Sequence, residues 1–164
     1  MGYDLRAVIG GTQILRRAVA DLGAARLTDL GHGLSLVPMT DELFDSVTDG
    51  NSADPLGFCF LPEGFADVLA RWSRAGDIAY AEAEYWGGVG TQRAAVWSRG
   101  SVVLGPLVLE EHESPSEQGT PISMALHSLG IRLNAEVDEF EAAGLRRHRH
   151  TEDWAGDSPS AVCE

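Results

Sequence analysis

The sequence contains no lysine, so all twelve of its strong bases are arginines. Against them stand 25 acidic residues, and the formal net charge is −13. The excess is spread along the chain, because residues 1–82 carry six arginines and twelve acids, and residues 83–164 carry six and thirteen. A field of this sign repels nucleic acids and anionic membranes and favours basic partners. We therefore expect a basic protein partner and neither a nucleic-acid nor a membrane ligand.

Cysteine is scarce as well. Cys59 and Cys163 are too few for a disulfide framework, and this usage is typical of a reducing cytosol. No apolar run approaches the roughly 18 residues of a membrane span, and the first residues lack the basic start and apolar stretch of a signal peptide. We accordingly expect a soluble, cytoplasmic protein. Cys59 lies in an apolar run, which favours a buried, inert thiol over a nucleophile.

The common catalytic and cofactor motifs are missing too. The sequence has no HExxH, no paired CxxC and no GxSxG, which excludes the commonest zinc-enzyme and serine-hydrolase patterns. The glycine cluster at 87–90 lacks the Lys-Ser/Thr pair of a phosphate loop, and a strand pattern follows it. We predict no cofactor. His148 and His150 are the candidates for metal ligands, but three neighbouring arginines favour docking of this segment onto the acidic surface of the chain itself.

Short elements separated by many glycines and prolines make up the rest of the sequence. A chain of 164 residues with 44% apolar residues is long enough for one domain with a core. The order of the elements predicts an α+β fold, in which an antiparallel sheet contains a meander and the helices pack mainly on one face. We expect a single domain over residues 1–150 and a flexible C-terminal tail over 151–164.

The expected elements are bounded by glycine, proline or capping residues. The predicted strands are Tyr3–Ile9, Arg26–Leu30, Leu34–Val37, Leu56–Leu61, Ile78–Trp86, Arg93–Trp97 and Val102–Leu109. Helices are expected to begin after a cap or with a proline, at Thr12, Thr40, Pro62 and Thr120-Pro121. A further acidic helix is expected over Glu136–Leu145.

The stretch AYAEAEYWGGVGTQRAAVW (79–97) contains the candidate functional residues. Period two places Tyr80, Glu82, Glu84 and Trp86 on one face of its first strand and small alanines on the other. Alanines let a helix pack closely, so we expect the alanine face to be core. The glycines that follow are typical of a turn between two strands.

Three hypotheses remain for the other face of that strand. In the first, the protein is non-enzymatic and this face binds a basic protein partner, as an immunity or regulatory factor does. In the second, Glu82 and Glu84, roughly 7 Å apart on a strand, are the acid and base of a small hydrolase-type enzyme. In the third, the apolar edge of the meander makes the protein a self-assembling structural subunit. The partner-binding residues of the first hypothesis are Tyr80, Glu82, Glu84, Trp86, Glu110, Glu111 and Glu113.

Four phrases of the sequence carry a resemblance. Together they resemble an uncharacterised family of small proteins from high-GC bacteria, and the likeness covers most of the chain. The small size, the acidity and the missing catalytic motifs are also similar in outline to immunity proteins of bacterial toxin systems, which implies a basic toxin as the partner. The phrases are FLPEGFADVLARWSRAG, AEAEYWGGVGTQRAAVW, GTPISMALHSLGI and DEFEAAGLRRHRHTEDW.

Overall fold

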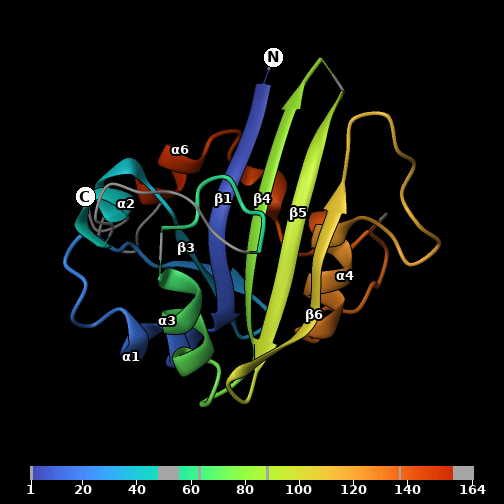
Figure 1. Cartoon of the computed structure of the whole chain (residues 1–164). Helices are drawn as coiled ribbons and strands as arrows, with labels where there is room; N and C mark the ends of the chain where they lie inside the picture. Colours follow the sequence, from blue (N-terminus) through green and yellow to red (C-terminus); the bar gives the residue numbers. More distant parts are fainter. Residues whose placement is uncertain (1, 48–55, 63, 88, 137, 157–164) are drawn as a thin grey trace.

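A six-stranded antiparallel sheet forms the centre of the protein (Figure 1). The computed structural model describes residues 2–47, 56–62, 64–87, 89–136 and 138–156. The strands lie in the order β2-β3-β1-β4-β5-β6, with β4, β5 and β6 forming the expected meander. The α+β class is therefore confirmed. The strands are β1 (Gly2–Gly11), β2 (Thr28–Gly31), β3 (Leu34–Pro38), β4 (Ile78–Trp86), β5 (Val89–Ser98) and β6 (Ser101–Leu109).

The helices divide between the two faces of this sheet, where we expected them mainly on one. We call the two sides the α3 face and the α4 face, after a helix on each (Figure 1). The reason is that the central strands carry apolar side chains on both faces of the sheet, for example Val8 and Ile9 on β1. Each face must therefore be buried under helices or other segments. The α3 face packs against α1 (Thr12–Ala18), α2 (Asp41–Val47) and α3 (Phe65–Trp72), and the α4 face against α4 (Pro121–Ser128), α5 (Glu139–Ala142), the 3₁₀ turn η1 (Leu145–Arg147) and α6 (Thr151–Ala155).

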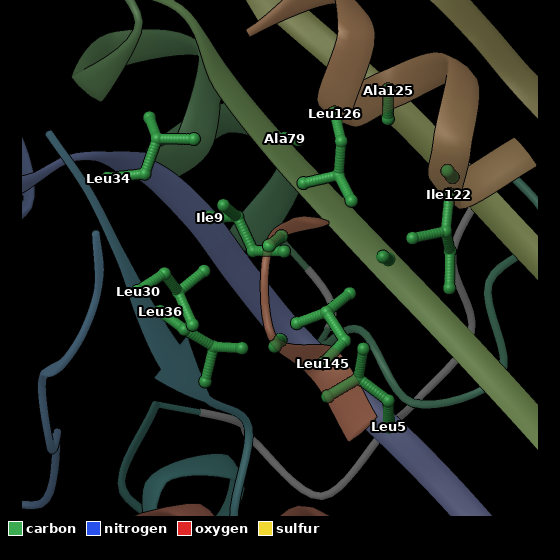
Figure 2. Packing of buried hydrophobic residues seen from close by; sticks show 14 of the residues in the cluster. Leu5, Ile9, Leu30, Leu34, Leu36, Ala79, Ile122, Ala125, Leu126 and Leu145 are labelled. Atoms are coloured by element: carbon green, nitrogen blue, oxygen red, sulfur yellow. The ribbon is translucent and has the colours of Figure 1, made fainter. Parts of the chain in front are cut away.

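The alanine side of β4 forms the floor of the α4 face, as predicted. Ile122 and Leu126 point from α4 toward the sheet, where Ala79 leaves room for them (Figure 2). The helix begins as its sequence indicates, because the Thr120 side chain accepts a hydrogen bond from the Ser123 amide at 3.2 Å. Small residues on a strand and a capped helix above them therefore account for this half of the core.

Two predicted elements are wrong. Residues 56–61 form an irregular segment instead of a buried strand, because Gly57 has a φ of 85° and the chain turns. Only part of the apolar run is buried, and Cys59, expected in the core, is exposed. The single helix expected over Glu136–Leu145 is interrupted at Gly144, whose φ is 76°, so that α5 and η1 take its place.

The C-terminal segment is part of the fold as far as Gly156. We expected a flexible tail over 151–164, but residues 151–155 form α6, and both Thr151 and Trp154 are fully buried. Residues 157–164 lie outside the described part of the chain. Among the described residues, no helix has the length and apolarity needed to cross a membrane.

Candidate functional site

Among the residues that the structure describes, no helix covers one half of the α3 face. Figure 1 shows α1 and α3 near the end of β1, while the start of β1, the end of β4 and the start of β5 extend beyond them. We call this uncovered region of the sheet the open half. It forms the floor of a groove of about 360 Å³, which lies beside the segment 59–60. The floor consists of three cross-strand rows: Arg6–Glu82–Arg93, Asp4–Glu84–Thr91 and Gly2–Trp86–Val89.

Glu82 lies at the closed end of the groove and holds the neighbouring segment to the sheet. Its Oε1 accepts the amide of Cys59, and its Oε2 accepts the amide of Phe60, each at 2.8 Å. The Tyr80 hydroxyl also donates to Oε2, at 2.9 Å. Burial raises the pKa of Glu82, and these hydrogen bonds oppose the rise only in part. A carboxylate with both oxygens occupied in this way anchors the segment.

Two of the residues expected on a partner-binding surface are buried. Tyr80 is 0% exposed and Glu82 is 6% exposed. Tyr80 lies in the core of the α3 face, where its ring meets Phe58 edge to face at 4.9 Å. The reason is that helices and the segment 56–61 cover half of this face, so the even positions of β4 divide between core and solvent. Neither side chain therefore presents a surface to a partner.

The arginines on either side of Glu82 are held by the chain itself. The Arg6 guanidinium lies 4.6 Å above the Phe60 ring and 3.8 Å from the Asp41 carboxylate. Arg93 lies 3.5 Å from the carboxylate of Glu110. Both pairs are partly exposed to solvent, so we assign them little stabilising energy. These ion pairs balance the charges at this end of the groove. The unpaired negative charge of the groove lies in the next row, Asp4–Glu84–Thr91.

That next row places two carboxylates opposite each other. Asp4 accepts from His150 Nδ1 at 2.7 Å and from the Thr151 hydroxyl at 2.8 Å. Partial burial pushes the pKa of Asp4 upward, but the hydrogen bonds from His150 and Thr151 outweigh it, and the pKa lies below its ordinary value. Glu84 is exposed, and among the described residues its carboxylate has no hydrogen-bond or ion-pair partner.

An exposed tryptophan adjoins this pair at the end of the groove. Trp86 is 74% exposed and follows Glu84 on the same face of β4, opposite Val89. Its ring lies directly over Gly2, where a Cβ atom would collide with it. By contrast, Trp97 and Trp154 are buried in the two cores. The open half therefore presents an unpaired carboxylate beside an accessible indole.

The acidic loop after β6 contributes less to this region than expected. Glu110 contacts Arg93 and so lies next to the groove. Glu111 and Glu113 are exposed, but neither lines the groove. The Glu113 carboxylate instead accepts the amide of Glu110 at 2.9 Å. The structure thus brings Glu84 and Trp86 together and leaves Glu111 and Glu113 outside.

The two histidines considered as metal ligands bind protein groups. The His148 ring packs edge to face on Trp154 at 4.7 Å, and His150 bonds to Asp4. Within the described part of the chain, no group of three metal-ligating side chains is present. Arg147 donates to the carbonyl of Asp29 at 3.2 Å. This segment therefore contacts β1 through the side chain of Asp4 and β2 through the carbonyl of Asp29.

Asp4, Arg6 and Arg93 were missed because the prediction considered β4 alone. In sequence, Asp4 and Arg6 alternate with apolar residues of the first strand, which marks them as one polar face. Their position opposite Glu84 and Glu82 depends on the pairing of β1 with β4, two strands separated by 66 residues. That long-range register is not visible in local periodicity.

Comparisons with protein-family models, with curated proteins and with solved structures find no match. The geometry of the open half is therefore the basis for a function. Its informative features are the facing carboxylates of Asp4 and Glu84, the exposed ring of Trp86 and the occupied oxygens of Glu82.

Proposed function

We propose that the protein is a non-enzymatic binding protein that receives a basic segment of a protein partner on its open half, as an immunity or regulatory factor does. The observation that carries the proposal is the unpaired carboxylate of Glu84, which faces Asp4 across the strands and adjoins the exposed Trp86. A cationic side chain from a partner would pair with the Glu84 carboxylate. No group of the described chain performs that task for Glu84.

The chemistry of the pair suits a guanidinium group. An arginine donates two parallel hydrogen bonds to a carboxylate and also lies favourably over the face of an indole. Glu84 supplies the carboxylate and Trp86 the ring, on neighbouring positions of one strand face. Both are accessible without any rearrangement of the sheet. We therefore infer an arginine of the partner at this position.

The net charge of the whole chain supports the same partner. A charge of −13 attracts a basic protein over a distance of about one Debye length, roughly 8–10 Å at physiological salt. Such a field increases the association rate and orients the encounter, while close contacts determine the dissociation rate. The acidity of the chain and the contacts of Glu84 and Trp86 would thus act at successive stages of binding.

The hydrogen bonds of Glu82 favour binding over hydrolysis. An acid/base mechanism with Glu82 and Glu84 needs both carboxylates free to exchange protons with a substrate or water. Three donors of the chain already occupy the oxygens of Glu82. These hydrogen bonds hold the segment 59–60 to β4, so we assign Glu82 a structural role.

The experiment is capture of partners from a lysate of the native host, at low and high salt, with matched variants as bait. Glu84→Gln and Glu42→Gln each remove one exposed carboxylate, and Glu42, on α2, does not line the groove. We expect a basic protein that the wild type and Glu42→Gln retain at low salt and release at high salt. Its affinity for Glu84→Gln and for Trp86→Ala should be about tenfold lower. The proposal fails if no such protein is captured, or if all variants retain it equally.

A further inference from the structure

A second cavity lies on the α4 face, behind the strand ends that form the open half. Its volume is about 540 Å³, which is within the range of small-molecule sites. Residues of β1, β4 and β5 line one side, and residues of the segment from 138 to 149 line the other. Because it faces away from the open half, its role is independent of the proposed partner binding. Its main lining residues are Tyr3, Tyr85, Gln92, Phe140, Arg146 and Arg149.

Aromatic rings form the wall of this cavity. Tyr3 and Tyr85 are cross-strand partners on β1 and β4. The rings of Tyr3 and Phe140 lie 5.5 Å apart at 57°. The Tyr3 hydroxyl donates to the carbonyl of Leu145 at 2.9 Å, and burial raises its pKa, so Tyr3 is a neutral phenol. The wall therefore offers an aromatic, uncharged surface to a ligand.

Two arginines without an acidic partner stand at the same cavity. Arg146 and Arg149 are exposed, and within the described residues neither guanidinium forms an ion pair. The guanidinium of Arg146 lies 5.9 Å from the centre of the Phe140 ring. Asp138 also lines the cavity, but its Oδ1 accepts the amide of Glu141 as the cap of α5. Two guanidinium groups at one cavity, beside a carboxylate whose Oδ1 is already engaged as a helix cap, suit an anionic ligand.

A buried glutamine orients a hydroxyl donor toward this site. The amide of Ile122 donates to Gln92 Oε1, and Gln92 Nε2 donates to the Tyr85 hydroxyl oxygen, each at 3.0 Å. The first bond fixes which end of the glutamine side chain faces Tyr85. Tyr85 accepts this bond, and its own hydroxyl proton makes no hydrogen bond to another described residue. Tyr85 lines the cavity and can donate that proton to a ligand.

We propose that this cavity binds a small aromatic anion, a ring that carries a carboxylate or a phosphate group. Arg146 and Arg149 bind the oxyanion through charge-assisted hydrogen bonds. Tyr85 donates a further hydrogen bond to it. The rings of Tyr3 and Phe140 pack against the aromatic body of the ligand. Neutral or purely aliphatic compounds lack one of these two features and bind more weakly.

The test is an NMR titration of the ¹⁵N-labelled protein with benzoate and phenyl phosphate, which represent the two oxyanions. Benzyl alcohol and acetate are the controls without the charge and without the ring. Ligands of about ten atoms bind in the range of about 0.1–10 mM, so the titration extends to about 10 mM. We expect saturable shifts at the side-chain amide of Gln92 and at Tyr85 and Phe140. The tighter of the two anions identifies the oxyanion.

Three variants decide whether the assigned residues bind the ligand. Arg149→Gln should weaken binding of the preferred anion about tenfold, and Tyr85→Phe about threefold. Arg16→Gln removes the same charge from α1, on the other face, and should leave binding unchanged. The proposal is overturned if neither anion gives saturable shifts, if benzyl alcohol binds equally well, if the shifts map to the α3 face, or if Arg149→Gln binds like the wild type. None of these results affects the capture experiment, which probes the opposite face.

Discussion

Glu82 is the residue that shapes the groove, because its carboxylate connects the segment 59–60 to β4. Its neighbour on the same strand face, Glu84, has a comparable sequence context but is exposed and unpaired. The alternation along β4 correctly predicted that both carboxylates lie on one face and the alanines on the other. It did not predict which carboxylate is buried, since that depends on how far the helices and the segment 56–61 extend over the sheet.

The two glutamates differ in what their removal does to stability. Glu82→Ala leaves the amides of Cys59 and Phe60 and the Tyr80 hydroxyl without their acceptor, so we expect the free energy of unfolding to fall by about 1–3 kcal/mol. Glu84→Ala removes an exposed group and should change it by less than about 0.5 kcal/mol. Urea denaturation followed by circular dichroism measures both. Equal losses in the two variants would contradict the anchoring role of Glu82.

The pKa values of Asp4 and Glu82 should be shifted in opposite directions from their ordinary values. The pKa of Asp4 is lowered, so its contribution to stability is present above the unfolded value of 3.8 and is lost as the pH falls through the folded value. The pKa of Glu82 is raised, so its contribution is present below the unfolded value of 4.5 and is lost as the pH rises through the folded value. Carboxyl ¹³C NMR titration measures both midpoints. An Asp4 midpoint above that of Glu82 would refute the assignment of these environments.

At the scale of elements, β4 and α4 could be predicted well and the segments around residues 56–61 and 136–156 could not. The bounds of β4 match the predicted Ile78–Trp86, and the Thr120 cap of α4 is a local signal. The run 56–61 is apolar because Phe58 and Leu61 pack in the core, although its backbone joins no ladder. The apolar content of this run thus correctly predicted that Phe58 and Leu61 are buried, but it wrongly predicted a strand.

The helix α6 gives a direct test of the C-terminal boundary of the fold. Trp154→Ala removes a fully buried side chain and should lower the free energy of unfolding by about 3–5 kcal/mol. Trp86→Ala makes the same change at a side chain that is 74% exposed and should cost less than about 1 kcal/mol. Thermal or urea unfolding compares the two. A small effect at Trp154 would mean that α6 does not pack as described.

The edge strand β6 bears on the hypothesis of self-assembly. Val102, Val103 and Val108 on this strand are exposed, and an apolar edge is a common pairing surface. Pro106, however, lies within the strand and has no amide to donate to an added strand. At this position the edge strand cannot donate a backbone hydrogen bond to an added strand.

For the whole molecule, charge count and charge placement carry different information. The sequence alone establishes a charge of −13 and predicts a basic partner. It does not reveal that the arginines near the groove are held by Phe60, Asp41 and Glu110, or that Glu84 is not. These contacts join segments far apart in the chain, and they confine the unpaired charge of the groove to one row of the sheet.

The most direct test of the central claim is an NMR titration with a short arginine-containing peptide and with the same peptide carrying neutral citrulline. The account predicts shifts concentrated at the Trp86 indole N–H, Glu84 and Thr91. These shifts should weaken with salt and be absent with citrulline or in Glu84→Ala. Shifts spread evenly over the acidic residues of both faces, or unchanged in Glu84→Ala, would contradict a specific cation-binding surface on the open half.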